Sequence, residues 1–155
     1  PEIPASAAVL VLRGARAQDL ASVEELLRTR GLPTAGFREH LGNFIVAEEK
    51  GTVRACGGFE RYGTDALVRS VAVARVAAGR GVGAALAREL ERRMTDAGVT
   101  RAFLLTDTAR EFWEERGFVA REWEAAPEAL RSSEEFKGAC PKCAALMAKN
   151  LEVSA

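Results

Sequence analysis

Residues 71–94 read VAVARVAAGRGVGAALARELERRM, which combines an alternating apolar strand, a glycine-rich turn and most of a helix. Glycine lets the backbone turn sharply and puts no side chain in the way, so amide N–H groups at the start of the helix can converge on an anion. The helix dipole adds about half a positive charge there. The segment predicts either a phosphate-binding turn or a tight strand-to-helix connection without a ligand.

The turn does not fit two common phosphate-binding motifs. A P-loop has Lys-Ser/Thr after its last glycine, and a dinucleotide-binding G-x-G-x-x-G would need glycine where Leu86 stands. The turn instead resembles the pyrophosphate-binding pattern Arg/Gln-x-x-Gly-x-Gly/Ala of the GNAT N-acetyltransferases. Gly81 and Gly83 fit this pattern, whereas Ala78 stands where the family has Arg or Gln.

A second block extends the resemblance. The family commonly carries Asn-x-x-Ala-x-x-x-Tyr-x-x-x-Gly-Phe, and residues 106–118 read TDTAREFWEERGF. Ala109, Gly117 and Phe118 are kept at the same spacing, while Thr106 replaces the Asn and Trp113 replaces the Tyr that often protonates the departing thiolate. An indole N–H cannot give up a proton at neutral pH, so Trp113 cannot act as that acid.

Shorter matches outside this core are similar to two groups within the family. These groups are the arsenic-resistance N-acetyltransferases and the short amino-acid N-acetyltransferases of the glutamate-acetylating kind. The matching segments are 31–34, 39–41, 43–44, 69–73, 105–106, 132–133, 135–136 and 140–141. The resemblance implies acetyl transfer to the amine of a small amino acid or an analogue of one, including an arsenical analogue in a resistance role.

The hydrophobic periodicity predicts alternating elements along the chain. Strands are expected over 9–13, 44–48, 52–61, 66–73, 101–105, 118–122 and 143–149, and helices over 19–28, 82–97, 108–116 and 127–131. We expect an α/β (α+β) GNAT fold: a mixed, mostly antiparallel sheet of about six or seven strands, with helices on both faces and a central splay between neighbouring parallel strands. Residues 1–8 are expected to form a flexible tail, and residues 9–155 a single N-acetyltransferase domain.

Charge and hydropathy limit the partners. The 155 residues include 22 Lys and Arg and 22 Asp and Glu, which gives a formal net charge of +0. This balance argues against general attraction to nucleic acid or to an anionic membrane surface, and no apolar stretch is long enough for a bilayer span. We therefore expect a cytoplasmic protein that binds neither. The resemblance implies a homodimer.

The resemblance also implies acetyl-CoA as co-substrate, with no metal required. The acceptor amine would attack the thioester directly in a ternary complex, and the Val71 backbone N–H would stabilise the developing oxyanion. From the residues alone, Arg80 can add a full positive charge at the glycine turn, and Arg75 is a second candidate. The expected cofactor-binding residues are Val71, Ala72, Val73, Gly79, Arg80, Gly81, Val82, Gly83, Ala84, Thr106, Ala109 and Phe112.

Two residues are candidates for proton transfer. An α-amino group with a pKa near 8 is about one tenth neutral at pH 7, so a strong general base is optional. By resemblance Glu60 is the expected base, acting directly or through water, with a solvated strand-end charge as the alternative. His40 is expected first to contact substrate; a role as base and a plain surface position are its alternatives.

An amino-acid acceptor needs a partner for its carboxylate, and a guanidinium fork suits it. Arg69 and Ser70 match an Arg-Ser signature of the resembling groups and are expected at the acceptor, while a salt bridge is the alternative for Arg69. Strict strand alternation predicts that Arg69 shares a face with Val71 and Val73. Arg131 and Lys142 are weaker carboxylate candidates.

Three cysteines, Cys56, Cys140 and Cys143, are too few for a disulfide scaffold. Cys140 and Cys143 are predicted to pack in a C-terminal strand, because free cysteine is often simply buried. Alternatively, the pair is half of a zinc site or a redox pair, or it chelates a trivalent arsenical or a soft metal. In that case the chain would be a catalytically weak binding or sensing module with a GNAT fold.

Overall fold

A computed structural model describes residues 9–139 and 142–151, and in this part of the chain seven strands form one sheet in the order β1-β2-β3-β4-β5-β7-β6. All neighbouring pairs are antiparallel except β4 and β5, which run parallel. This confirms the predicted mixed, mostly antiparallel sheet. The strands are β1 Val11–Gly14, β2 Phe44–Glu49, β3 Thr52–Tyr62, β4 Asp65–Val73, β5 Arg101–Thr106, β6 Val119–Arg121 and β7 Ala145–Asn150.

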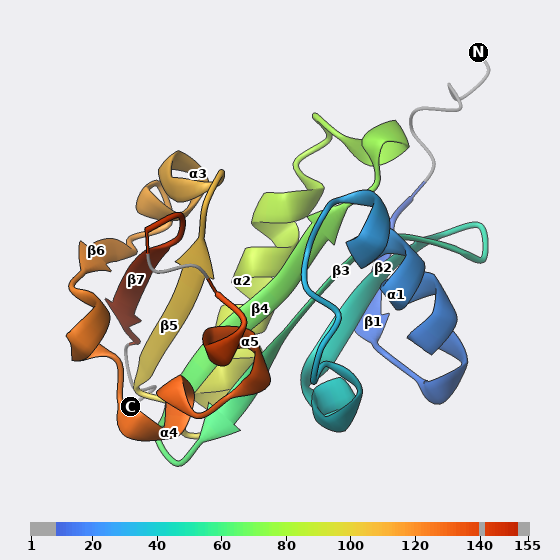
Figure 1. Cartoon of the computed structure of the whole chain (residues 1–155). Helices are drawn as coiled ribbons and strands as arrows, with labels where there is room; N and C mark the ends of the chain where they lie inside the picture. Colours follow the sequence, from blue (N-terminus) through green and yellow to red (C-terminus); the bar gives the residue numbers. More distant parts are fainter. Residues whose placement is uncertain (1–8, 140–141, 152–155) are drawn as a thin grey trace.

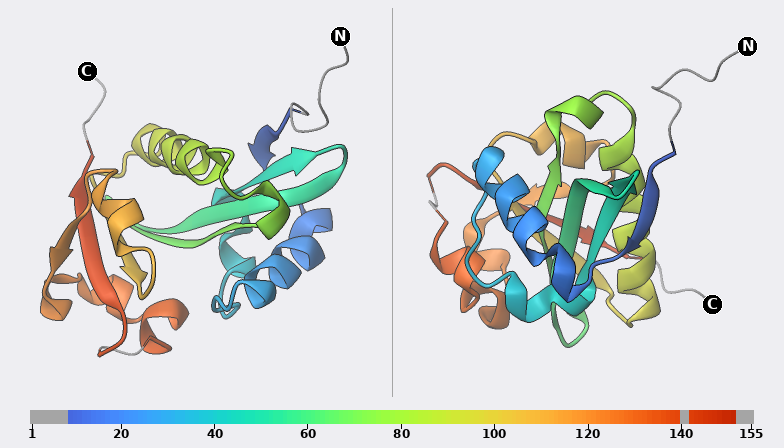
Figure 2. Two further views of the ribbon diagram at one scale, coloured as in Figure 1. Left: turned by 90° about the horizontal axis from the view of Figure 1, so that it is seen from above. Right: turned by 90° about the vertical axis from the view of Figure 1, so that its right-hand side faces the viewer.

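Helices cover both faces of the sheet (Figures 1 and 2). The long helix α2 lies on one face, while α1, α4 and α5 lie on the other. The α-helices are α1 Leu20–Thr29, α2 Val82–Asp96, α3 Arg110–Glu114, α4 Glu128–Arg131 and α5 Glu134–Lys137. The short 3-10 helices are η2 Ala17–Asp19, η3 Arg38–Asn43, η4 Arg75–Ala77 and η5 Trp123–Ala125.

The helix α2 packs through the stripe that periodicity predicted. Val82, Leu86, Leu90 and Met94 are all buried in the core between α2 and the sheet. Arg93, beside this stripe, is half-buried and pairs with Glu89 at 2.8 Å. An arginine on the flank of the stripe can bury its aliphatic stem while its head group stays at an acidic partner.

None of the helices within residues 9–139 and 142–151 is both long enough and apolar enough to cross a membrane.

A bulge interrupts β4 halfway along its pairing with β3. Between the pairs Gly58–Arg69 and Cys56–Ala72, β4 has two residues where β3 has one. The first of the two, Ser70, has a φ of +60°, in the left-handed region that few side chains adopt. An extra residue of this kind bends a strand and moves all later side chains to the opposite face.

The bulge overturns one expectation from alternation. Val68, before the bulge, packs in the core under α2, and so do Val71 and Val73 after it. Arg69 lies on the other face with Leu67, which packs in the core under α4 and α5. The prediction that Arg69 shares a face with Val71 and Val73 is therefore wrong, because strict alternation does not hold across an inserted residue.

The sheet splays beside the bulge, as predicted. The parallel pairing of β4 with β5 runs from Asp65–Arg101 to Val68–Leu104 and ends there. Beyond this point β5 stays paired with β7 as far as Thr106, while β4 leans away toward β3 (Figure 1). The edge of β4 from residue 69 onward is therefore open on the β5 side.

The close packing around the β2–β3 pair gives a stability prediction. A Cβ at Gly58 would overlap the ring of Phe44, whereas nothing lies within 4 Å of a Cβ at Gly42. Gly58→Ala should lower the free energy of unfolding by about 1–3 kcal/mol, and Gly42→Ala should change it far less. Urea denaturation of both variants measures the difference. Equal stability of the two would show that the Phe44 ring does not sit where the structure has it.

Candidate active site

The glycine turn before α2 has the form that an anion requires. Gly79 and Gly81 have φ values of +78° and +76°, and nothing lies within 4 Å of a Cβ placed on either one. Gly81 is the N-cap of α2, and the first helical hydrogen bond runs from Ala85 N–H to its carbonyl. The N–H groups of residues 82–84 therefore have no partner within the helix and are available to a ligand.

The second sequence block forms a wall beside this turn. A Cβ at Gly83 would lie 3.3 Å from the ring of Phe112, so glycine here allows α3 to approach α2 closely. Thr106, at the end of β5, accepts a hydrogen bond from the Ala109 N–H at 3.0 Å and so shapes the turn into α3. The predicted cofactor residues of the two blocks are brought together at one end of the sheet.

Arg80 has a protein partner in this structure. Its Nη2 lies 2.9 Å from Oε2 of Glu49, at the end of β2. This contact is the main reason that the pKa of the Glu49 carboxyl is lowered. The expected contact between Arg80 and a bound anion stays a prediction, and it competes with this ion pair.

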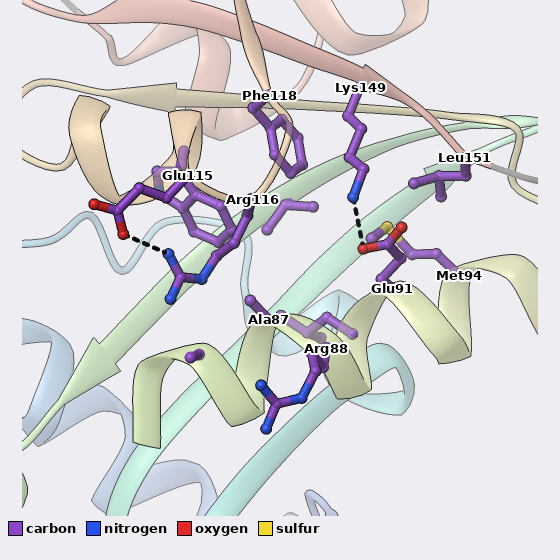
Figure 3. Close-up of a pocket in the computed structure, with 13 residues that line it drawn as sticks. Ala87, Arg88, Glu91, Met94, Glu115, Arg116, Phe118, Lys149 and Leu151 are labelled. Atoms are coloured by element: carbon purple, nitrogen blue, oxygen red, sulfur yellow. Dashed lines mark hydrogen bonds and ion pairs between the residues drawn. The ribbon is translucent and has the colours of Figure 1, made fainter. Parts of the chain in front are cut away.

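A groove of about 400 Å³ runs between α2 and α3 and was not foreseen from the sequence (Figure 3). Ala84 and Arg88 of α2 line it, and so does Arg116, which follows the end of α3. Farther along α2, Lys149 of β7 reaches Glu91 at 3.0 Å. These residues come from segments far apart in the sequence and have no common motif, so only the fold reveals them as one surface.

On the opposite face, most of the predicted acceptor residues meet in a buried polar cluster. The Arg69 side chain has no exposed surface, and its Nη1 lies 2.7 Å from Oε2 of Glu60. Its Nε donates to the Ser70 hydroxyl at 2.9 Å. His40 stands at the rim, one quarter exposed, with Nε2 3.7 Å from Oε1 of Glu60.

These contacts bear on two of the alternatives. Glu60 is only 1% exposed, so it is not a solvated strand-end charge. Its second oxygen accepts a hydrogen bond from the Tyr62 hydroxyl, whose pKa is raised by burial and by this bond. Arg69 forms a salt bridge with Glu60, which was the alternative to its expected role in binding the acceptor carboxylate. Within the described residues, both oxygens of Glu60 and two of the three guanidinium nitrogens of Arg69 have close partners.

One member of the cluster was missed. Glu135, on α5, has Oε1 3.6 Å from Arg69 Nε, while its Oε2 is buried without a hydrogen-bond partner among the described residues. Burial raises the pKa of this carboxyl to about 7, with Arg69 opposing the rise and Glu60 adding to it. The sequence resemblance at residues 135–136 pointed to this position. However, a helix of four residues is too short for its hydrophobic periodicity to show which face Glu135 occupies.

The cysteines supply neither a nucleophile nor a described metal site. Cys56 is buried, its thiol contacts the Ser70 carbonyl at 3.3 Å, and burial raises its pKa to about 12. Cys143 is disulfide-bonded, which leaves no thiolate there for a soft ion, while Cys140 lies outside the described residues. In the described ranges, three or more His, Cys, Asp or Glu side chains do not come together as metal ligands.

Trp113, at the position of the family's tyrosine, is part of the core. It is 7% exposed and meets Phe112 and Phe118 edge-on, with ring centroids 4.9 and 5.3 Å away. This placement gives the indole a packing role in the core.

The sequence of this chain matches a known protein family. The model of the acetyltransferase (GNAT) family matches residues 14–118, which is more than half of the chain and includes both the glycine turn and the second block. The chain belongs to the GNAT acetyltransferase family. It is thereby placed among acyltransferases that take their acetyl group from acetyl-CoA.

Individual relatives agree with this assignment. An uncharacterized N-acetyltransferase of Chlorobaculum tepidum is 28% identical over 134 residues, which cover 80% of this chain and 84% of the relative. The Mycobacterium tuberculosis protein Rv2747, solved in complex with CoA, has a TM-score of 0.77 at 25% identity and covers 92% and 99% of the two chains.

A larger protein has the same fold over part of its length. N-acetylglutamate synthase of Neisseria gonorrhoeae, solved with coenzyme A and N-acetyl-glutamate, has a TM-score of 0.80 at 21% identity. The match covers 94% of this chain but 36% of the synthase, so this chain spans about a third of that protein. At this identity the likeness shows the fold.

The glycine turn can be tested with a matched pair of variants. Gly81 and Gly63 both have positive φ, +76° and +65°, and open space around a Cβ. Substitution by alanine should therefore lower the free energy of unfolding by a similar, modest amount at both positions, because alanine is disfavoured in the left-handed backbone conformation. Only Gly81→Ala should weaken acetyl-CoA binding, by about tenfold or more, since its Cβ would keep a phosphate from the helix N-terminus. Calorimetry showing equal affinity for both folded variants would contradict the assignment.

Proposed function

We propose that this protein transfers the acetyl group of acetyl-CoA to the amine of a small amino acid or amino-acid analogue, by direct attack within a ternary complex. The observation that carries the proposal is the open edge of β4, which begins at Arg69. The glycine turn lies toward the α2 side of this edge and the polar cluster toward the α5 side. Two reactants can therefore meet at the edge from opposite faces of the sheet.

The cofactor side is assigned residue by residue. The free N–H groups of residues 82–84 would hold the pyrophosphate, with Gly79 and Gly81 leaving room for it. The open edge at residues 71–73 would pair with the amides of the pantetheine arm. Phe112, Thr106 and Ala109 would wall that arm, and the groove with Arg88 and Arg116 would take the nucleotide end.

The chemistry at the edge needs few groups. When bound, acetyl-CoA supplies an activated thioester. The Val71 N–H, in the bulge, is the proposed donor to the developing oxyanion, a contribution of about 3–4 kcal/mol where one such donor has been removed in another enzyme. Because Trp113 cannot supply a proton, the proton that the thiolate needs would come from water or from the ammonium formed on the acceptor.

The acceptor class rests on the polar cluster. An amino acid brings both an amine and a carboxylate, and the cluster offers carboxylates, a guanidinium and His40 in one place. The synthase that has this fold over part of its length was solved with coenzyme A and N-acetyl-glutamate, which supports an amino-acid acceptor. To reach the proposed carboxylate site, the acceptor must open the contact around Arg69 Nη2, whose described partner is the Pro33 carbonyl at 3.5 Å. An arsenical acceptor, a cytoplasmic location and a homodimer are further proposals from the sequence resemblance and charge.

The acceptor class can be tested by a thiol-release assay. Acetyl-CoA would be incubated with the protein and with free amino acids, phosphinic and arsenical glutamate analogues, peptides with a free N-terminus, and a lysine side-chain amine. We expect CoA release and an N-acetylated product, seen by mass spectrometry, with one or more free amino acids or analogues. Acetylation of peptides alone would contradict the acceptor class, and no acetylation of any amine would contradict the proposed activity.

A further inference from the structure

The buried cluster on the α5 side has one hydrogen-bond donor too few. It holds two carboxylates, Glu60 and Glu135, and one guanidinium, Arg69. Glu60 has partners on both oxygens. Glu135 has none on Oε2, and its Oε1 is 3.6 Å from Arg69 Nε, which is too far for a hydrogen bond. Within the described residues, the donor that Glu135 lacks must therefore come from outside the cluster.

The missing donor has the chemistry of the proposed acceptor. A buried carboxylate oxygen without a partner loses its hydration and gains nothing in return, which makes it a site where a ligand atom is expected. A group that brings N–H donors and a positive charge would satisfy it and would also balance the excess negative charge of the cluster. An amine at neutral pH is mostly in the ammonium form and brings both.

We propose that Glu135 binds the ammonium group of the acceptor and takes its proton before the amine attacks the thioester, an inference that rests on the proposed acetyl transfer. Arg69 is the first residue of β4 beyond its last β5 pair, so the strand position against which Glu135 packs is the one where the open edge begins. The turn at Gly36 packs against α5 beside this group, since an added Cβ would lie 3.1 Å from Glu134 Cβ and 3.4 Å from Arg69 Nη1.

The surroundings favour Glu135 over Glu60 for this task. The oxygens of Glu60 hold Arg69 and Tyr62 in place, so Glu60 acts as a positioning residue. The groups that face Glu135 are Arg69 from β4, which favours its charged form, and Glu60 from β3, which opposes it, with Tyr62 beside Glu60. His40 flanks Glu60 from η3. The raised pKa of Glu135, about 7, suits a base that works near neutral pH.

The step balances without a further reactant. One N–H bond of the ammonium breaks and its proton moves to Oε2 of Glu135, which leaves a neutral amine with a lone pair. That pair forms the new C–N bond as the carbonyl becomes tetrahedral, and the C–S bond then breaks. The second nitrogen proton passes to the thiolate to give CoA, and Glu135 releases its proton to solvent when the product leaves.

The test compares Glu135→Gln with Glu134→Gln, its exposed neighbour on α5. Rates of acetylation of the amino acid found in the thiol-release assay would be measured from pH 6 to pH 10. We expect Glu135→Gln to lower kcat/KM by about tenfold near pH 7, because about one tenth of the amine is already neutral there without a base. The loss should shrink as the pH passes the pKa of the amine, about 8 or above, because the amine then arrives neutral. Glu134→Gln should keep the wild-type profile, and both variants should bind acetyl-CoA as the wild type does.

A measurement of stability against pH checks that the Glu135→Gln variant is folded. Because the pKa of Glu135 is higher in the folded protein than in the unfolded chain, folded wild type keeps a proton that the unfolded chain loses as the pH rises toward 7. Its stability should therefore fall over that range more than that of Glu135→Gln, which stays neutral and should fold well. Should Glu135→Gln nevertheless unfold, Glu135→Asp provides the second test, with a reduced rate but the pH profile of a carboxylate base.

Three results would contradict either the role of Glu135 or the proposed function. A folded Glu135→Gln with wild-type kcat/KM at every pH overturns the inference. A rise in KM alone, equal across the pH range, overturns it as well, because binding without proton transfer would not depend on the ionisation of the amine. If the wild type acetylates no amine, the proposed function itself fails, whereas the change of stability with pH still reports on the buried carboxyl.

Discussion

The bulge at Ser70 is the constraint on which the site depends. Without a bulge, strict alternation through residues 69–73 would put Arg69 on the same face as Val71 and Val73. With it, Arg69 points toward α5 while Val71 and Val73 pack under α2. The strand therefore serves two environments within a few residues, a dry one that supports the helix of the glycine turn and a polar one that receives α5. The left-handed backbone at Ser70 carries some strain for this arrangement.

The Glu60–Arg69 ion pair is better understood as a device for position than as a source of stability. Removing two charges from water costs free energy that their attraction only partly returns, so a buried pair is weak evidence for a more stable fold. It does fix the guanidinium, since Nη1 is held by Glu60 and Nε by the Ser70 hydroxyl. A fixed cation next to Glu135 keeps that carboxyl from a still higher pKa. The positions of the three groups are thus coupled, and no single one explains the electrostatics of the cluster.

The sequence was enough to predict the fold, and it also indicated the proposed cofactor end of the site. The glycine turn and the second block have fixed spacing, and the apolar stripe of α2 is long enough for its period to be clear. The acceptor end was less predictable, because a bulge is invisible to a rule of strict alternation and α5 is a helix of four residues. The pairing of Arg80 with Glu49 also joins residues 31 positions apart, for which no local pattern exists.

The short parallel ladder between β4 and β5 also affects how the molecule holds together. The halves β1 to β4 and β5 to β7 are joined within the sheet by the pairs Asp65–Arg101 to Val68–Leu104, and α2 and its core bridge them from one face. A molecule that lies in the open part of the edge and touches both halves acts as an additional connection between them. Ligand binding of this kind adds to the free energy of unfolding in proportion to the logarithm of ligand concentration. The thermal stability of such a fold is then a property of the protein together with its co-substrate, and its melting temperature reports how much acetyl-CoA surrounds it.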